Sequence, residues 1–209
     1  VSAWTNAGAG QLFHSPVQGS GIEERAVSLI EGEDAFHGTP DDLFFGHARL
    51  APVGAAGPEV ITLARKNARM RITVRGLDRR IPEDRYYLTV EIPNDGYDFV
   101  GNPIAGTARV RRTGAFHDNG DFSTDEAFNL IHTDPAVSPA GGVTVNLYEK
   151  AIGRSADRLI ASVTDDDGRP ISLPTGRTVN LLIDLNEGGG LSVYTEITPW
   201  DEIYQWDIW

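Results

Sequence analysis

Residues 69–75 read Arg-Met-Arg-Ile-Thr-Val-Arg, and this stretch decides the fold class of the 209-residue chain. Met70, Ile72 and Val74 fall on one side of an extended strand, and the three arginines and the threonine fall on the other. Alternation with a period of two is typical of a strand that buries one face and leaves the other in water. We therefore predict a sheet whose wet face carries positive charge.

Similar alternating segments recur along the chain and are separated by turn residues. We expect further strands at 1–5, 25–30, 87–93, 107–112, 143–149, 158–165, 177–185 and 191–198. Residues 165–170, Asp-Asp-Asp-Gly-Arg-Pro, predict a tight turn in which Gly168 has a positive φ. Residues 186–190, Asn-Glu-Gly-Gly-Gly, predict a hairpin loop between the last two strands.

Helical periodicity is nearly absent from the chain. The best candidate is one turn at residues 124–128, with Ser123 or Thr124 as the capping residue. Because no crossover helices lie between the strands, the pattern favours an all-β, antiparallel sandwich over a parallel α/β sheet.

The first 57 residues differ from the rest because they hold few strand signals. A Gly/Ala/Pro segment at 51–58 resembles a linker. Two or three strands cannot close a core, so this part needs partner strands from outside its own sequence. We predict a boundary between residues 1–57 and a complete sandwich at 58–209.

The composition excludes several classes of function. The hydrophobic content of 40% is enough for a core, and the balance of 18 basic against 30 acidic residues gives a charge of -12, which argues against nucleic-acid or anionic-membrane partners. The chain has no cysteine, so it offers no disulfide, thiolate zinc site or thiol nucleophile. No segment approaches the roughly 20 apolar residues that span a bilayer.

Catalytic motifs are also absent from the sequence. The five histidines accompany no nucleophile elbow and no His-Glu-x-x-His pattern, so we expect neither an enzyme nor a cofactor. The acidic segment 117–126 could supply oxygen ligands to calcium, but its spacing fails the EF-hand pattern. We favour a solvated loop whose Asp and Asn side chains bond their own backbone.

Two surface features are candidates for subunit contacts. Eight of the 18 basic residues lie within 21 positions, between residues 65 and 85, and Arg69, Arg71 and Arg75 would form a stripe on one strand. The stripe could meet an acidic neighbouring subunit, although a plain solvated face is the simpler interpretation.

The second feature is the aromatic C-terminal segment that contains Trp200, Tyr204, Trp206 and Trp209. This segment could be donated to a groove in another subunit or pack on its own sandwich. Packing of the segment on its own sandwich is favoured, because Pro199 and two acidic residues interrupt the strand before the aromatic residues.

The order of the segments resembles the FimB/Mfa-type fimbrial subunit family of Gram-negative anaerobes. The matching stretches, each weak alone, are 41–46 (Asp-Asp-Leu-Phe-Phe-Gly), 60–69, 96–101, 128–131, 143–148, 180–185 and 198–200. The resemblance implies transthyretin-like, Ig-like Greek-key sandwiches that assemble by strand donation between fimbrial subunits. It also implies outer-membrane attachment through a lipidated N-terminal cysteine.

The resemblance further implies an N-terminal sandwich that precedes Val1. We therefore expect an N-terminally truncated chain whose residues 1–57 are the remnant of that sandwich. The function implied is a non-enzymatic structural or adhesive subunit, an anchor or minor component of surface fimbriae. A carbohydrate-binding module is the first alternative, because exposed aromatic rings on sandwiches also stack on sugars. An accessory domain cut from a hydrolase is the second.

Overall fold

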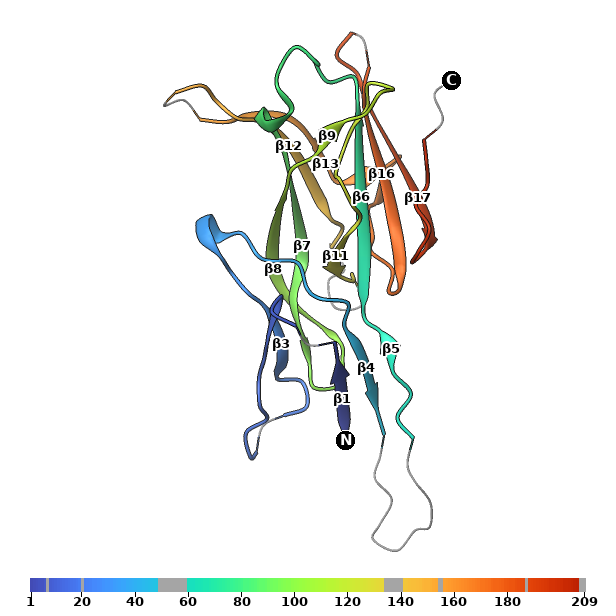
Figure 1. Cartoon of the computed structure of the whole chain (residues 1–209). Helices are drawn as coiled ribbons and strands as arrows, with labels where there is room; N and C mark the ends of the chain where they lie inside the picture. The colour runs from blue at the N-terminus through green and yellow to red at the C-terminus, as the bar shows by residue number, and fades with distance from the viewer. Residues whose placement is uncertain are drawn as a thin grey trace, which may run out of the picture.

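The computed structural model describes residues 1–6, 8–19, 21–48, 60–133, 141–153, 156–186 and 188–206. Two six-stranded sheets form a sandwich, and a smaller three-stranded sheet lies toward the lower end of Figure 1. In the described residues helical structure is confined to the single 3-10 turns Glu33–Ala35 (η1) and Glu83–Arg85 (η2). The predicted all-β sandwich is therefore confirmed.

The first sheet contains the predicted strand at residues 69–75, which is part of β6. Its order is β17-β16-β6-β10-β9, and β11 also pairs with β6. Met70, Ile72 and Val74 of β6 are fully buried, whereas Arg69, Arg71, Thr73 and Arg75 are partly exposed, as the alternation predicts. The strands are β6 (Asn67–Arg75), β9 (Ala115–Phe116), β10 (Phe122–Ser123), β11 (Phe128–Ile131), β16 (Arg177–Leu185) and β17 (Leu191–Pro199).

The second sheet is organised around β7, its longest strand. Its order is β13-β12-β7-β3-β2, and β8 pairs with the remaining edge of β7. The strands are β2 (Gln11–Phe13), β3 (Arg25–Leu29), β7 (Tyr86–Asp98), β8 (Pro103–Arg112), β12 (Thr144–Glu149) and β13 (Arg158–Val163).

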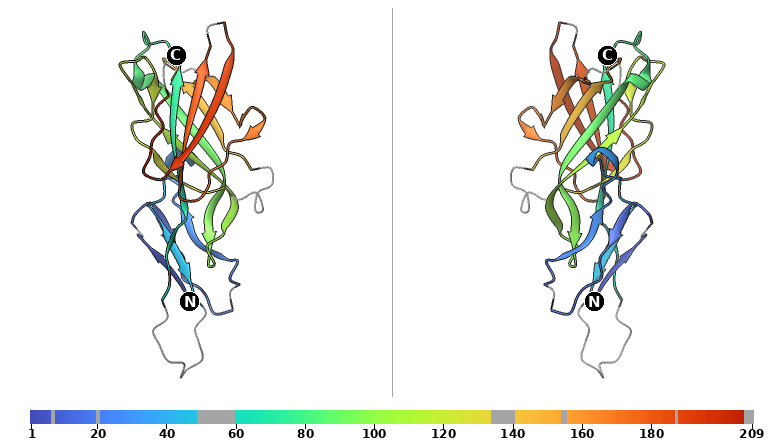
Figure 2. Two further views of the ribbon diagram at one scale, coloured as in Figure 1. Left: turned by 90° about the vertical axis from the view of Figure 1, so that its right-hand side faces the viewer. Right: turned by 90° about the vertical axis from the view of Figure 1, so that its left-hand side faces the viewer.

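One hydrophobic core fills the space between these two sheets. Its largest fully buried side chains include Tyr86, Phe122, Leu88, Leu130 and Leu147. They come from alternate positions of strands in both sheets, so a sheet's inner face is apolar and its outer face is polar. Figure 2 shows the same two layers from the sides.

The strand β7 is longer than the predicted 87–93, and it continues through residues 94–98 although Asn94, Asp95 and Gly96 are residue types typical of turns. Register shifts after Ile92 and Asn94 let the ladder to β8 continue to Tyr97. Gly96 makes the pairing of β3 with the other edge of β7 possible, because a Cβ at residue 96 would collide with the carbonyl oxygen of Val27 in β3. The missing side chain thus lets β3 add to the sheet.

All strand pairs but one are antiparallel in the described residues, and the exception joins β6 to β16. Leu181 pairs with Ile72 in this parallel ladder. Parallel neighbours need a long crossover connection, and here the intervening strands of the second sheet provide it. The prediction of an antiparallel sandwich holds for the architecture, with this single departure.

Both predicted turns form. Asp167 and Gly168 have φ values of 51° and 77° between the two-residue strands β14 (Asp165–Asp166) and β15 (Arg169–Pro170). Asn186 closes the hairpin between β16 and β17, because its N–H donates to the Gly190 carbonyl at 3.0 Å.

The predicted helical turn at 124–128 is wrong. Phe128 begins β11, and Thr124 lies just after the end of β10. The Thr124 N–H donates to the Ile72 carbonyl, and its Oγ1 accepts from the Ile72 N–H. Pairing with β6 therefore satisfies the backbone groups that a helix would have used.

The N-terminal strands find partners within the chain. Besides β3 on β7, the strands β1 (Ser2–Thr5), β4 (Phe44–His47) and β5 (Ala64–Arg65) form a three-stranded sheet at the lower end of Figure 1. Most of the proposed linker at 51–58 lies outside the described residues, and the boundary at residue 57 stays a prediction.

Candidate subunit interface

The candidate interface lies on the outer face of the β6 sheet, where the C-terminal segment turns back over it. Pro199 ends β17, and a turn follows in which the Glu202 N–H donates to the Pro199 carbonyl at 3.0 Å. The Tyr204 N–H then donates to Asn180 Oδ1 on the central strand β16 at 3.1 Å. The segment therefore crosses the sheet instead of extending it.

Trp200 fastens the start of this segment to the arginine-rich face. Its side chain is 9% exposed, and the guanidinium carbons of Arg65 and Arg69 lie 4.0 Å and 5.2 Å from its ring centre. Arg69 and Thr178 also donate to the Trp200 carbonyl, at 3.1 Å and 2.8 Å. Trp200 is thus an intramolecular anchor for the segment.

Arg65 is held in place by a carboxylate that the sequence analysis did not single out. Its Nε and Nη2 donate to the two oxygens of Asp42 at 2.7 Å and 2.8 Å. This bidentate hydrogen bond raises the pKa of Arg65. The fixed guanidinium gives Trp200 a rigid surface on which to stack.

Arg75 is also paired, at the opposite end of β6. Its guanidinium contacts both oxygens of Asp121, at 3.2 Å and 3.3 Å, and the hydrogen bond raises the pKa of Arg75. Asp121 belongs to the acidic segment weighed as a calcium loop. Asn119 donates to its carboxylate and accepts from its N–H, both at 3.1 Å, so the predicted local bonding is present. The prediction of a solvated loop is wrong for Asp121, which is 5% exposed because it pairs with Arg75.

Arg71 differs from these paired arginines. Its Nε is buried and has no hydrogen-bond partner in the described part of the chain. It lines a cleft of about 230 Å³ with Asp121, Tyr204 and Trp206. Between the arginine stripe and the C-terminal segment the structure thus leaves a small polar hollow bordered by aromatic rings.

The aromatic side chains beyond Trp200 form a partly exposed cluster. The ring centres of Tyr204 and Trp206 are 4.9 Å apart, and Trp206 lies 6.4 Å from Tyr194 of β17. Tyr204 is 41% exposed. Trp209, the remaining predicted residue, lies outside the described residues.

The structure therefore brings six of the seven predicted interaction residues to one face. Asp42, Asp121 and Asn180 complete the arrangement, and the sequence analysis missed their roles. For Asn180 a signal existed in residues 179–183, Val-Asn-Leu-Leu-Ile. Apolar residues stand there at both odd and even positions, which indicates a strand covered on both faces. The two aspartates carry no such local signal.

The fold matches solved structures of surface proteins. The chain superposes on the fimbrial anchor protein Mfa2 from Porphyromonas gingivalis with a TM-score of 0.61 at 12% identity, covering 95% of this chain and 74% of that one. A candidate polysaccharide-binding protein from Bacteroides thetaiotaomicron gives a TM-score of 0.63 at 12% identity, with the same coverage. These likenesses define the fold class, a β-sandwich of the Mfa2 type.

Sequence comparison gives the family. Residues 1–206 match the family described as "Fimbrillin-A associated anchor proteins Mfa1 and Mfa2", and the chain belongs to it. A curated relative, the major fimbrium anchoring subunit FimB of Porphyromonas gingivalis, is 27% identical over 190 residues. The alignment covers 84% of this chain and 57% of that protein, so the chain spans little more than half of the relative's length.

Among the described residues, no helix is long and apolar enough to cross a membrane. The same residues contain no group of three or more His, Cys, Asp or Glu side chains that could hold a metal ion.

Proposed function

We propose that the chain is a structural subunit of bacterial surface fimbriae, and within them an anchoring or minor subunit. The family match over residues 1–206 carries this proposal. Membership in a family of fimbrial anchor proteins implies a place in cell-surface fimbriae of a Gram-negative bacterium and argues against an enzyme. Attachment to the outer membrane through a lipid anchor outside these 209 residues is part of the proposal.

We further propose that neighbouring subunits join this one by strand complementation. The edge strand β17 supports this mechanism, because β16 is its only ladder partner in the described residues. Leu191, Tyr194 and Ile197 on β17 are 45%, 48% and 49% exposed. Long edge strands with exposed apolar side chains invite pairing, and natural proteins usually blunt them.

One feature of this edge limits access to it. The Asp166 carboxylate accepts hydrogen bonds from the Thr195 N–H at 2.8 Å and from its hydroxyl at 2.6 Å. A partner strand that paired along the whole of β17 would displace this carboxylate. The Tyr204–Trp206 cluster lies beside Tyr194 of β17 and would border such a partner.

Site-specific photo-crosslinking tests this mechanism. A photoreactive residue at Ile197 should capture a fimbrial subunit on cells. The same residue at Leu159, which is 50% exposed on the edge strand of the other sheet, is the matched control. Equal capture at both positions would contradict a specific role for β17.

Loss of the whole protein tests the anchor role separately. In the producing bacterium, deletion of its gene should move fimbriae from the cells into the medium. An unchanged distribution of fimbriae would contradict anchoring, whatever the crosslinking shows.

A second candidate function, carbohydrate binding, is favoured by the hollow beside Arg71. Tyr204 and Trp206 offer rings for stacking on a sugar, and Asn119 and Asp121, which also line the hollow, offer polar atoms. Titration with glycans should then quench tryptophan fluorescence saturably, and Trp206→Ala should abolish the effect. Absence of saturable quenching would remove this candidate.

A further inference from the structure

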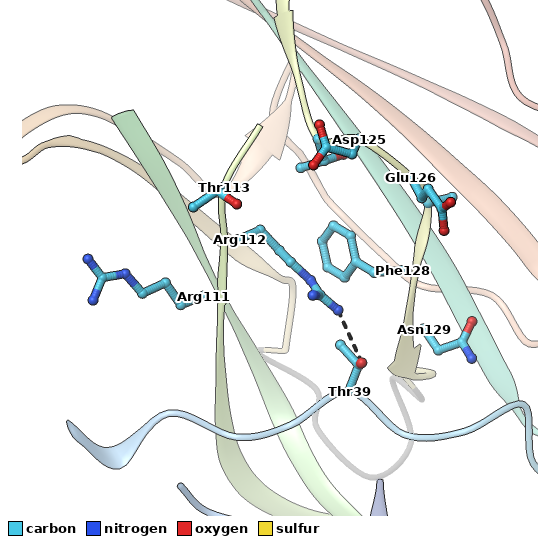
Figure 3. Close-up of a pocket in the computed structure, with 10 residues that line it drawn as sticks. Thr39, Arg111, Arg112, Thr113, Asp125, Glu126, Phe128 and Asn129 are labelled. Carbon is cyan, nitrogen blue, oxygen red and sulfur yellow. Dashed lines mark hydrogen bonds between the residues drawn. The ribbon is translucent and has the colours of Figure 1, made fainter. Parts of the chain in front are cut away.

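A second cleft opens on the other side of the sandwich, where the two sheets separate. It measures about 740 Å³ and lies between the end of β8 and the interruption between β10 and β11. Figure 3 shows Arg112 crossing its centre between Thr39 and Phe128. The walls include Thr113, Thr124 and Asn129, so the lining is largely polar.

Arg112 occupies a position where the strand pattern calls for an apolar residue. Ala108 and Val110 precede it on the inward side of β8, and both are buried in the core. The Arg112 guanidinium carbon lies 4.7 Å from the Phe128 ring centre. One guanidinium nitrogen donates to Thr39 Oγ1 at 3.1 Å, whereas the buried Nε has no hydrogen-bond partner in the described residues.

Arg112 lacks the carboxylate partner that four other partly buried arginines have. Arg25, Arg65, Arg75 and Arg85 have side chains 24% to 32% exposed, and each pairs with a carboxylate at 3.2 Å or less. Arg112 forms no ion pair with any described residue, and burial lowers its pKa. Burial without a counter-charge is unfavourable, and a bound anion would compensate for it.

The acidic residues of the cleft do not serve as that partner. Asp125 and Glu126 line the rim and are exposed, and neither forms an ion pair with Arg112. In the view of Figure 3 the Phe128 ring lies between Arg112 and Glu126. The guanidinium points away from Thr113 and toward Thr39 in the same view.

The edge of β8 beside the cleft indicates what kind of ligand would carry the anion. In the described residues β8 has one ladder partner, β7. On the opposite edge His37 occupies both backbone groups of Arg109: its N–H donates to the Arg109 carbonyl at 2.6 Å, and its Nδ1 accepts from the Arg109 N–H at 3.2 Å. The Arg111 guanidinium carbon lies 5.7 Å from the Phe36 ring centre, and the backbone edge from Arg111 onward has no ladder partner in the described residues. An extended polypeptide could pair with this edge from Arg111 onward and direct alternate side chains inward, toward Arg112.

We propose that the Arg112 cleft is a carboxylate-binding site whose occupant is an aspartate or glutamate side chain of an extended polypeptide lying along the edge of β8 from Arg111 onward. The planar guanidinium suits bidentate contact with a carboxylate. This site is separate from β17 and does not depend on the fimbrial assignment.

An inward-pointing charge has another known use, because it discourages unwanted pairing of edge strands. That role requires no particular ligand and is lost with the charge. The two roles make different predictions: protection alone predicts self-association of an Arg112→Gln variant and no response to a carboxylate.

Nuclear magnetic resonance of arginine side chains tests the proposal on the intact chain. The probes are the capped peptide Ac-Val-Thr-Glu-Thr-Val-amide, the same peptide with Gln in place of Glu, and free glucuronate. The Arg112 Nε–H signal is assigned in the unmodified protein by through-bond correlation to the Arg112 backbone. We expect the Glu peptide to shift this signal saturably and the Gln peptide to bind about tenfold more weakly.

The control variant is Arg109→Gln, which removes an exposed arginine of the same strand that pairs with Glu91 outside the cleft. It should bind the Glu peptide as the unmodified protein does, while Arg112→Gln should bind it about tenfold more weakly. Equal responses to the two peptides, or none, would overturn the site. Because that comparison uses the unmodified protein, it holds even if Arg112→Gln fails to fold. If free glucuronate saturated the Arg112 signal at a lower concentration than the Glu peptide does, that result would overturn the proposal that the occupant is a polypeptide.

Discussion

The packing of Trp200 predicts that this one side chain holds the C-terminal segment on the β6 sheet. Trp200→Ala removes the ring that stacks on Arg65 and Arg69, but it leaves the backbone carbonyl that Arg69 and Thr178 use. The variant therefore separates side-chain packing from backbone hydrogen bonding. We expect a folded but less stable protein with a loosened segment.

The expected loss follows from the buried area. A tryptophan that is 9% exposed buries an area of about 200 Å², which at about 25 cal/mol per Å² corresponds to an upper limit of about 5 kcal/mol. Core Trp→Ala substitutions cost about 3–5 kcal/mol. The neighbouring arginine side chains are long and can close over the space, so we expect about 3 kcal/mol.

Two measurements check this value. Urea unfolding followed by circular dichroism gives the free energy of unfolding, and hydrogen exchange at the Tyr204 amide reports on the segment, because that N–H donates to Asn180. Ile203→Ala, at a 41% exposed position in the same segment, should change stability by no more than about 0.5 kcal/mol. A loss below about 1 kcal/mol for Trp200→Ala, or unchanged Tyr204 protection, would refute the reasoning.

Three further predictions follow from other contacts. Asp121→Asn removes the charge of a 7% exposed carboxylate that pairs with Arg75, and urea unfolding should show a loss of about 2 kcal/mol. Gly76→Ala, at φ 85°, places a Cβ against a backbone carbonyl and should cost about 3 kcal/mol or more by the same assay. Burial and a hydrogen bond to a carboxylate raise the pKa of Tyr87 to about 12, so ultraviolet titration should find this phenol neutral when ordinary tyrosines have ionised.

Each of these predictions has its own check. Gly153→Ala has a similar φ of 86° but no atom within 4 Å of the new Cβ, so it should cost only about 1 kcal/mol. Equal losses at the two glycines would contradict the collision. An unchanged free energy of unfolding for Asp121→Asn would mean that water stabilises the Arg75 guanidinium as well as the Asp121 carboxylate does.

For Tyr87, the folded state favours the neutral phenol, whose ordinary pKa is 10.0. Its stabilising contribution is complete below pH 10.0 and is lost as the pH rises toward about 12. A Tyr87 phenol that ionises with the exposed tyrosines would contradict this assignment.

Several elements of the fold follow from local sequence patterns. The alternation in β6 specifies which of its side chains are buried, and Gly168 specifies a turn, because both depend on residues a few positions apart. Residues 94–98 and 124–128 show the limit of such patterns. Their turn and helix signals are overridden by pairing with β8 and β6, partners distant in the sequence.

The candidate interface was predictable only in part. An arginine stripe and an aromatic tail can be recognised in the sequence, but their contact cannot. Arg69 meets Trp200 across 131 positions of the chain, and Arg75 meets Asp121 across 46. No local pattern encodes a pairing between such distant residues.

Sequence alone thus determined the all-β class, the buried face of β6 and the residue types available for contacts, since these depend on side-chain alternation and composition. Tertiary structure alone decided that β16 runs parallel to β6, that the C-terminal segment lies across their outer face, and that Arg112 faces a cleft without a counter-charge. The physical reason is that an alternating strand presents the same edges to every neighbour. Only the combined burial and hydrogen bonding of the whole chain selects which neighbour it takes.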